Sequence, residues 1–145
     1  MAAAAPAAPS HALTKNQQLV LSALQNSAAP LSAYSLLDHL RDDGFRAPLQ
    51  VYRALEKLIA FGLVHRLESL NSFVACSHRH DHGPGSHPHG HGVIAFAICE
   101  RCGRVEEFTD EAVEERLTGW AGSNGFKLEK TIIEMRGTCA ACLAH

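Results

Sequence analysis

The spacing of apolar residues changes along the chain from the period of a helix to that of a strand. Before Gly62, apolar residues recur at i, i+3, i+4 and i+7, the spacing of one helical face. We predict a first helix beginning at Thr14, where Gln17 completes a capping box. We predict a second helix from near Ser32 to Gly44 and a third from about Pro48 to Gly62.

Beyond Gly62 the pattern predicts two short strands, 63–68 and 72–76, joined by a turn at 69–71. Three helices followed by a hairpin is the order of a winged helix-turn-helix. Residues 77–92 contain no large apolar side chain, so they predict a linker or a ligand-bearing loop.

The C-terminal part has a different order of elements. Strands are expected over 93–98, 104–108 and 126–135, with a helix capped by Asp110 whose apolar side suits a sheet surface. The fold class predicted is α+β, an N-terminal winged helix-turn-helix domain followed by a small α/β domain. The boundaries predicted are a disordered tail over 1–12, a DNA-binding domain over 13–76, a His-rich hinge over 77–92 and a C-terminal domain over 93–145.

Composition narrows the function classes only a little. Apolar residues make up 46% of the chain and charged residues 19%, which is ordinary for a globular protein. The net charge of −2 gives no general attraction to nucleic acid, so any DNA contact must come from a local basic face. No apolar run approaches the ~20 residues of a membrane helix, so no membrane partner is expected.

The cysteines supply the strongest chemical signal. Two C-x-x-C pairs, Cys99 with Cys102 and Cys139 with Cys142, provide the four thiolates of a tetrahedral structural zinc site. Disulfides are the alternative, but they need an oxidising compartment, and the Ala/Pro-rich start of the chain does not resemble a secretory signal. Unrelated core cysteines would rarely repeat the same spacing twice. The spacing therefore predicts a zinc site built from four cysteines.

The third predicted helix carries a polar face suited to the major groove. A helical wheel gathers Gln50, Arg53 and Lys57 opposite the apolar stripe, with Tyr52 beside them. Arginine can bind a guanine edge, glutamine an adenine edge and lysine a phosphate. Arg66 is the one cation of the predicted wing. A solvated helix face with no DNA role is the alternative.

A second metal site is predicted around Cys76, the one cysteine outside the two C-x-x-C pairs, which we call the first and second knuckle. His65 lies on the partner strand, six histidines fall between His78 and His91, and Glu107 follows the first knuckle. A mixed nitrogen, thiolate and carboxylate set favours zinc over manganese or magnesium. An ion with ligands from both halves would act as a switch of their arrangement. The alternatives are a buried core Cys76, a satisfied strand histidine, or a loose metal buffer built on the histidine run.

Catalysis is disfavoured. The chain has no His-Glu-x-x-His, Gly-x-Ser-x-Gly or phosphate-binding loop motif. The proposed ligands fill all four zinc positions with protein, whereas a zinc hydrolase keeps one position for water. We therefore do not expect an enzyme.

Several ordered stretches resemble the ferric uptake regulator family, and specifically its zinc-uptake branch. They extend over nearly the whole chain, from about residue 13 to Cys142. The stretch that points to the zinc branch is Glu-Ser-Leu-Asn-Ser-Phe-Val-Ala-Cys, ending at Cys76. The others are Leu-Ser-Ala-Tyr at 31–34, Val-Tyr-Arg-Ala-Leu at 51–55, Gly-Leu-Val-His-Arg at 62–66 and the two knuckles.

The resemblance implies a homodimeric cytoplasmic repressor of zinc-uptake genes that binds a palindromic, A/T-rich operator. It implies a dimerisation role for the C-terminal domain and about two zinc ions per subunit, one structural and one regulatory. The regulatory ligands implied are His65, Cys76 and Glu107 with His91, and with His89, His82, His80 and His78 as further possibilities. The family's histidine seven positions before Cys99 would fall on Gly92 here, which is why His91 is assigned.

The resemblance also implies DNA contacts. Tyr52 and Arg53 match the family's contacting pair, Tyr34 lies in one of the matching stretches, and Lys15 stands where the family often has Pro-Gln-Arg nearby. Two other functions remain open. One is an iron- or manganese-responsive regulator of the same family, and the other is a histidine-rich zinc storage or chaperone protein.

Overall fold

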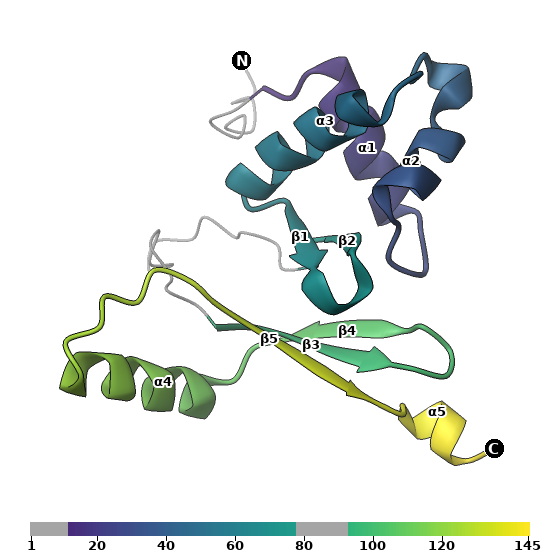
Figure 1. The fold of residues 1–145 in the computed structure, drawn as a ribbon. Coiled ribbons are helices and arrows are strands. Elements are labelled where there is room, and N and C mark those ends of the chain that lie inside the picture. The colour runs from purple at the N-terminus through teal and green to yellow at the C-terminus, as the bar shows by residue number, and fades with distance from the viewer. Residues whose placement is uncertain (1–11, 78–92) are drawn as a thin grey trace, which may run out of the picture. The chain divides into compact units, whose positions relative to one another are not determined.

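The structure is a computed structural model that describes residues 12–77 and 93–145 and divides into two compact units, Met1–Cys76 and Ser77–His145 (Figure 1). The predicted tail, apart from its last residue, and the predicted hinge beyond Ser77 lie outside the described residues. The loop histidines at 78, 80, 82, 89 and 91, predicted as possible zinc ligands, also lie outside the described residues.

Three helices form the N-terminal unit: α1 (Lys15–Gln25), α2 (Ala33–His39) and α3 (Pro48–Ala60). The predicted capping box is confirmed, because Gln17 N donates to Thr14 Oγ1 at 3.2 Å and Thr14 N donates to Gln17 Oε1 at 3.0 Å. The prediction that the second helix reaches Gly44 is wrong. α2 ends at His39, and the chain continues as a 3-10 turn, η1 (Arg41–Asp43), before Gly44 turns it at φ 99°.

The core of this unit lies where the three helices meet. Its members are apolar side chains at the periodic positions that the sequence pattern indicates, and they include Val20, Leu36, Val51, Leu55 and Leu58, each at most 1% exposed. Burial of this set supplies the main stabilisation of so small a unit.

A wing follows the helices. Strands β1 (Val64–Leu67) and β2 (Ser72–Ala75) pair antiparallel and are joined by a 3-10 turn, η2 (Glu68–Leu70), with Asn71 in the left-handed region at φ 46°. Leu31 extends this sheet by a bridge to Phe73, which the sequence pattern did not predict. The winged helix-turn-helix fold is confirmed.

The C-terminal unit contains a three-stranded sheet of order β4-β3-β5, formed by β3 (Val93–Cys99), β4 (Val105–Phe108) and β5 (Thr131–Gly137). β4 is antiparallel to β3, and β5 is parallel to it. The last strand begins at Thr131 rather than at the predicted Phe126, because Thr131 is the first residue of β5 that finds a partner on β3.

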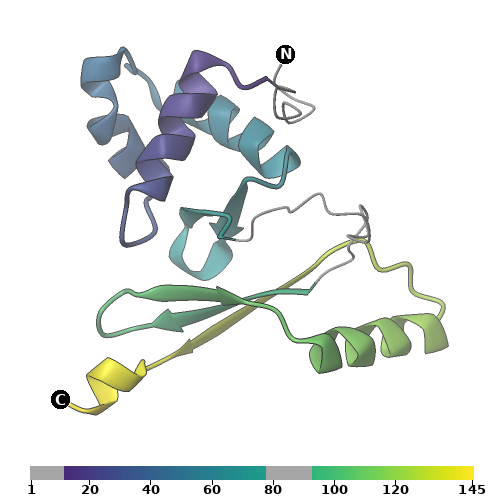
Figure 2. The same ribbon diagram turned by 180° about the vertical axis from the view of Figure 1, so that it is seen from behind.

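Helix α4 (Glu111–Ser123) is capped as predicted, since Val113 N donates to Asp110 Oδ1 at 3.1 Å. The expected packing of its apolar side on the sheet is wrong. Both ribbon views place α4 beyond the ends of the strands rather than over a sheet face (Figures 1 and 2). Val113 remains 38% exposed and Trp120 60% exposed, and the helix buries Ala121. A short unpredicted helix, α5 (Ala140–Leu143), follows β5.

Candidate metal centre and nucleic-acid interface

The sheet register brings the two cysteine knuckles to the same end of the C-terminal unit. β3 and β5 are parallel, and Cys99 at the end of β3 pairs with Gly137 at the end of β5. The first knuckle turns directly after β3, with Gly103 at φ 76°, a backbone conformation that glycine adopts without strain. The second knuckle begins at Cys139, the N-cap of α5. Parallel pairing therefore places residues far apart in sequence beside each other.

The four thiols fit a tetrahedral metal site. The sulfur atoms of Cys99, Cys102, Cys139 and Cys142 all lie within 4.8 Å of one another. Sγ of Cys102 and Sγ of Cys139 are 3.7 Å apart. Four sulfurs bound tetrahedrally to zinc at about 2.3 Å lie about 3.8 Å from one another, so this spacing matches a Zn–thiolate centre.

The pKa values of two thiols in this cluster, Cys99 and Cys142, are shifted in opposite directions. The backbone N–H of Cys139 donates to Cys99 Sγ at 3.3 Å and, with that of Cys102, lowers the pKa of the Cys99 thiol to about 6. The neighbouring thiol of Cys139 and then burial raise the pKa of Cys142 to about 12. The lowered pKa favours the thiolate form of Cys99, which is the form that binds metals. A bound divalent cation would also favour the thiolate form of Cys142 and release its proton.

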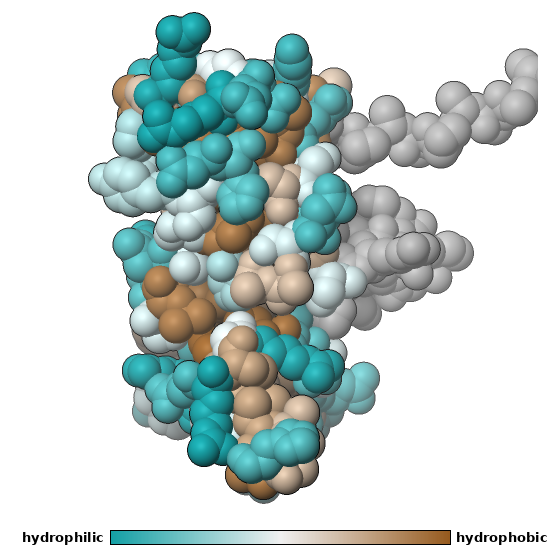
Figure 3. All heavy atoms as spheres, turned by 90° about the vertical axis from the view of Figure 1, so that its right-hand side faces the viewer, coloured by the Kyte–Doolittle hydropathy of each residue, from teal (hydrophilic) through white to brown (hydrophobic). Residues whose placement is uncertain are grey.

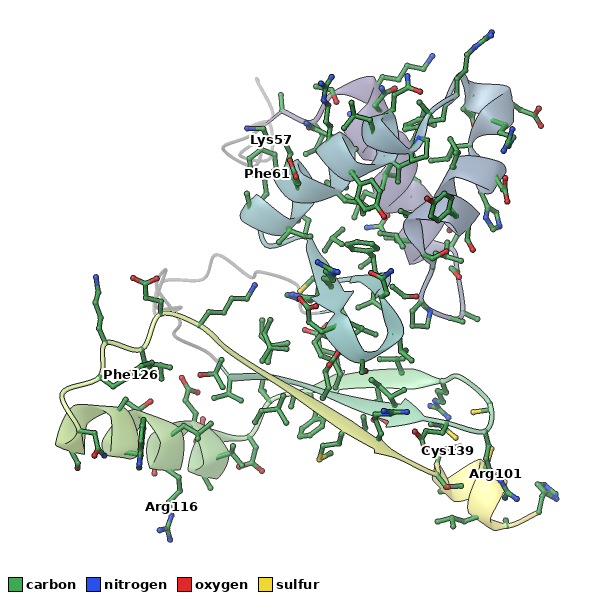
Figure 4. All side chains as sticks on the ribbon, in the orientation of Figure 1. Lys57, Phe61, Arg101, Arg116, Phe126 and Cys139 are labelled. Carbon is green, nitrogen blue, oxygen red and sulfur yellow. The ribbon has the colours of Figure 1, made fainter. Side chains whose placement is uncertain are left out.

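Contacts outside the sulfur atoms join the two knuckles. Glu100 N donates to the carbonyl oxygen of Gly137 at 2.8 Å, and Arg101 Nη1 donates to the carbonyl oxygen of Cys142 at 2.9 Å. Arg136 and Glu100 form an ion pair at 2.6 Å. Figure 4 shows Arg101 and Cys139 side by side at this end, next to the sulfur atoms. The sequence pattern predicted the ligands but missed these supports, because they depend on the parallel register.

In the N-terminal unit, the wing brings His65 and Cys76 together. His65 pairs with Val74 in the β1–β2 ladder, and Cys76 N donates to the carbonyl oxygen of Leu63 at 2.8 Å, which continues that register. Alternate residues of a strand share a face, so both side chains project from one face of the hairpin. A ring nitrogen of His65 and Cys76 Sγ lie within 4.8 Å of each other. His65 is buried, and Cys76 is partly buried.

Glu107 lies on β4 of the C-terminal unit, where it pairs with Phe96 of β3. Its Oε2 accepts hydrogen bonds from both the backbone N–H and the hydroxyl of Ser77, each at 3.1 Å. A carboxylate oriented by two donors keeps a fixed direction, which is a useful property of a metal ligand.

The exposed side of α3 differs from the helical-wheel expectation at one position. Arg53 and Lys57 are exposed, and Figure 4 shows Lys57 near the C-terminal end of the helix. Gln50 instead turns back to the helix start, where its Oε1 accepts from the backbone N–H groups of Arg46 at 2.7 Å and Ala47 at 3.1 Å. That oxygen satisfies helix donors that would otherwise have no partner in the helix.

The other predicted DNA-contacting residues are at the surface of the N-terminal unit. Lys15 is the first residue of α1, and Tyr34 on α2 is 66% exposed. A shallow hollow beside α3 has Thr14, Asn16 and Gln17 on one side and Arg53 and Lys57 on the other. On the wing, Arg66 Nη2 donates to Asn71 Oδ1 at 3.1 Å and lies 3.8 Å from Glu68.

A winged helix with exposed cations on α3, followed by a unit with four clustered cysteines, is the arrangement of a metal-dependent regulator that binds DNA. Residues 10–136 match the ferric uptake regulator family. The chain belongs to that family. Within it, the chain is a DNA-binding transcription regulator of the zinc-uptake-regulator kind and not an enzyme.

Individual relatives agree with this placement. The chain is 43% identical over 126 residues to the zinc uptake regulation protein of Escherichia coli (strain K12), a match that covers 86% of this chain and 68% of the relative. A solved structure of a zinc uptake regulator complexed with zinc and DNA is 39% identical, with a TM-score of 0.80, and the match covers 92% of this chain and 84% of the other. The crystal structure of holo XcZur is also 39% identical, with a TM-score of 0.77 and coverage of 94% and 89%.

Proposed function

We propose that this protein is a zinc-responsive repressor of zinc-uptake genes, in which a second, labile zinc controls binding to operator DNA. The observation that carries the proposal is the pairing of His65 and Cys76 on one face of the wing, within 4.8 Å of each other. A thiolate beside an imidazole is a ligand pair that zinc prefers to iron(II) or manganese(II).

The remaining ligands are proposed from the other half of the chain. Glu107 is hydrogen-bonded to Ser77, the residue covalently attached to Cys76, which supports its inclusion in the set. A histidine of the loop, His91 in the first place or His89, would complete four ligands. Because such a set draws on both units, zinc favours one arrangement of the two and shifts the population towards it.

The four-cysteine centre is proposed to hold a second, permanent zinc. The spacing of its sulfurs supports this assignment, and the contacts between the knuckles would make a bound zinc part of the fold. Closed four-thiolate centres are structural, since they leave no position for a substrate or water. The protein would therefore hold about two zinc ions per subunit, with different exchange rates.

A homodimer is proposed as the active form. The C-terminal unit exposes large apolar side chains: Val113, Trp120, Phe126, Ile132 and Met135. Figure 3 shows one face of the protein, where hydrophobic residues in brown lie at the surface among hydrophilic ones in teal. β5 is also an edge strand of its sheet. A second copy of the chain would cover this surface. A twofold dimer in turn reads a palindrome, so the operator is proposed to be palindromic. The resemblance to the family further implies that the operator is A/T-rich and that the protein acts in the cytoplasm.

Among the described residues, no helix has the length and apolar character needed to cross a bilayer. An iron- or manganese-responsive regulator is the second candidate, but the thiolate of Cys76 disfavours those ions. The zinc storage alternative rests on the histidine run, which lies outside the described residues, and membership of a regulator family argues against it.

The decisive experiment measures DNA binding against free metal. A duplex selected by the protein from a random pool in the presence of zinc serves as the probe. Titration with zinc, iron(II) and manganese(II) is compared with the chelated protein, with zinc content measured in parallel. We expect zinc to raise affinity about 5- to 150-fold, the usual range for coupled sites. Equal affinity with and without chelator, at one retained zinc per chain, would reject the switch.

A further inference from the structure

The exposed face of α3 carries an aliphatic side chain at its N-terminal end. Leu49, Tyr52, Arg53 and Glu56 are all exposed, at positions i, i+3, i+4 and i+7 of one helical face. Leu49 is 56% exposed, whereas the other leucines of α3, at positions 55 and 58, are at most 1% exposed. The face that carries Arg53 therefore begins with a large apolar group.

Leu49 has no packing role in the core of the N-terminal unit. Val51, Ala54, Leu55 and Leu58 bury the inner side of α3, and Leu49 is not among the partly buried residues that pack against that core. The start of α3 is capped by Gln50, whose Oε1 accepts hydrogen bonds from two backbone N–H groups. The side chain of Leu49 is thus available to a ligand.

Single exposed leucines are common on protein surfaces, so exposure alone indicates no ligand. The position is what distinguishes this one. Pro48 is the first residue of α3 and Leu49 is the second, and the N-terminal residues of a recognition helix are those that contact base edges in the major groove. Arg53, one helical turn later, is the proposed guanine-reading residue on the same face.

We propose that Leu49 is a specificity-determining residue that packs against the C5-methyl group of a thymine in the major groove. The methyl is the apolar feature of that groove and distinguishes thymine from the other bases. Leu49 and Arg53 are separated by about 6 Å along the helix axis, at 1.5 Å per residue. The thymine is therefore expected about one to two base pairs from the base that Arg53 contacts, at about 3.4 Å per step.

This inference rests on the proposed operator binding, and a methyl-deletion scan tests it separately. The probe is a duplex selected from a random pool by the wild-type protein with zinc, resynthesised with deoxyuridine in place of one thymidine at a time. Uracil keeps every hydrogen-bonding group of thymine and lacks the methyl. We expect one or two positions per half-site where the wild-type protein loses about 4-fold in affinity, the effect of one buried methyl group.

Three variants make the scan specific. Leu49→Ala should bind thymidine and deoxyuridine duplexes equally at those positions, and it should fold, because alanine favours helix. Leu49→Met, which keeps a long apolar side chain, should retain the discrimination. Leu70→Ala is the matched control, since Leu70 is a 39% exposed leucine on the wing turn rather than on α3, and its discrimination should remain that of the wild type.

The outcomes separate the inference from the proposed function. Unchanged methyl discrimination in Leu49→Ala, or its absence in the wild type despite specific binding, would overturn the role of Leu49 and leave the repressor proposal intact. Failure of the wild-type protein to select any sequence in zinc would instead reject the repressor proposal, and the inference with it. Binding of Leu49→Ala to nonspecific DNA at low salt verifies that the unit is folded.

Discussion

Arg53 and Lys57 are the two cations on the exposed side of α3, and their side chains are suited to different parts of DNA. The planar guanidinium of Arg53 can make two parallel hydrogen bonds to a guanine edge. The ammonium group of Lys57 is a point charge suited to a phosphate, and it lies one turn further from the helix start. The same face can therefore combine sequence reading with general attraction to the backbone.

Replacing each cation by alanine should separate these roles. Arg53→Ala should cost about 1–3 kcal/mol on the selected duplex and relax the preference at one base position. Lys57→Ala, the matched control, should weaken binding to all sequences equally and reduce the salt slope by about 1. Affinities on a set of single-base variants at several salt concentrations provide the measurement. Equal losses on every sequence in Arg53→Ala would mark it as a phosphate contact.

A second residue-scale prediction concerns Cys76. Cys76→Ser should fold normally yet lose most of its response to zinc, with operator affinity in zinc close to that of the chelated wild type, because serine is a poor zinc ligand. Ala75→Ser places the same hydroxyl on the other face of the hairpin and should keep the response. Zinc titration followed by DNA binding checks both variants, and an unchanged response in Cys76→Ser would remove Cys76 from the ligand set.

At the scale of elements, the two knuckles are stabilised by each other. The first follows β3 and the second follows β5, and their mutual contacts pass through Cys99 Sγ, Arg101 and Glu100. β5 is held to the sheet along one edge only, so these contacts fix its far end, and the proposed zinc would fix it further. A zinc ion in this centre would therefore stabilise the strand pairing as well as the turn.

Loss of one knuckle thiolate should consequently destabilise the C-terminal unit. Cys99→Ser is expected to lose the permanent zinc and the dimer, since binding of structural zinc contributes on the order of 10 kcal/mol to small metal-built domains. Metal content and light scattering measure the result. Cys76→Ser is the control and should retain both the permanent zinc and the dimer. An intact Cys99→Ser dimer that still holds zinc at the knuckles would contradict a structural role.

Local signals predicted most of these elements. Residues close in sequence determine the helix caps at Thr14 and Asp110 and the apolar spacing of α3. The structure confirms all three. The errors fall where partners are distant. The start of β5 at Thr131 depends on its register with Val93, and the bridge from Leu31 depends on Phe73. The role of Gln50 as a helix cap was missed because the wheel treats every polar residue as outward-facing.

At the scale of the whole molecule, the C-terminal unit carries large apolar side chains at its surface. Trp120 and Phe126 are exposed, and their ring centroids lie 6.0 Å apart. Burial of aromatic side chains is among the largest contributions to an interface. The prediction that α4 covers the sheet was wrong, and its apolar side is instead exposed, where the proposed second copy of the chain would cover it.

A charge at this surface should weaken the dimer. Trp120→Glu is expected to shift the protein to monomers and to reduce operator binding, because it replaces buried aromatic area by a desolvated carboxylate. Thr118→Glu adds the same charge on the opposite side of α4 and should leave the dimer intact. Analytical ultracentrifugation across a concentration series measures both. A Trp120→Glu dimer as tight as the wild type would place the interface elsewhere.

The order in which the ribosome delivers the knuckles has a consequence for metal loading. Cys99 and Cys102 emerge during synthesis well before Cys139 and Cys142, so a nascent chain presents half a coordination shell until β5 has been made. Parallel pairing of β3 with β5 is needed to align the halves. If the four-sulfur centre holds zinc as proposed, a chain interrupted before Cys139 would lack two of the four thiols and would fail to retain the ion.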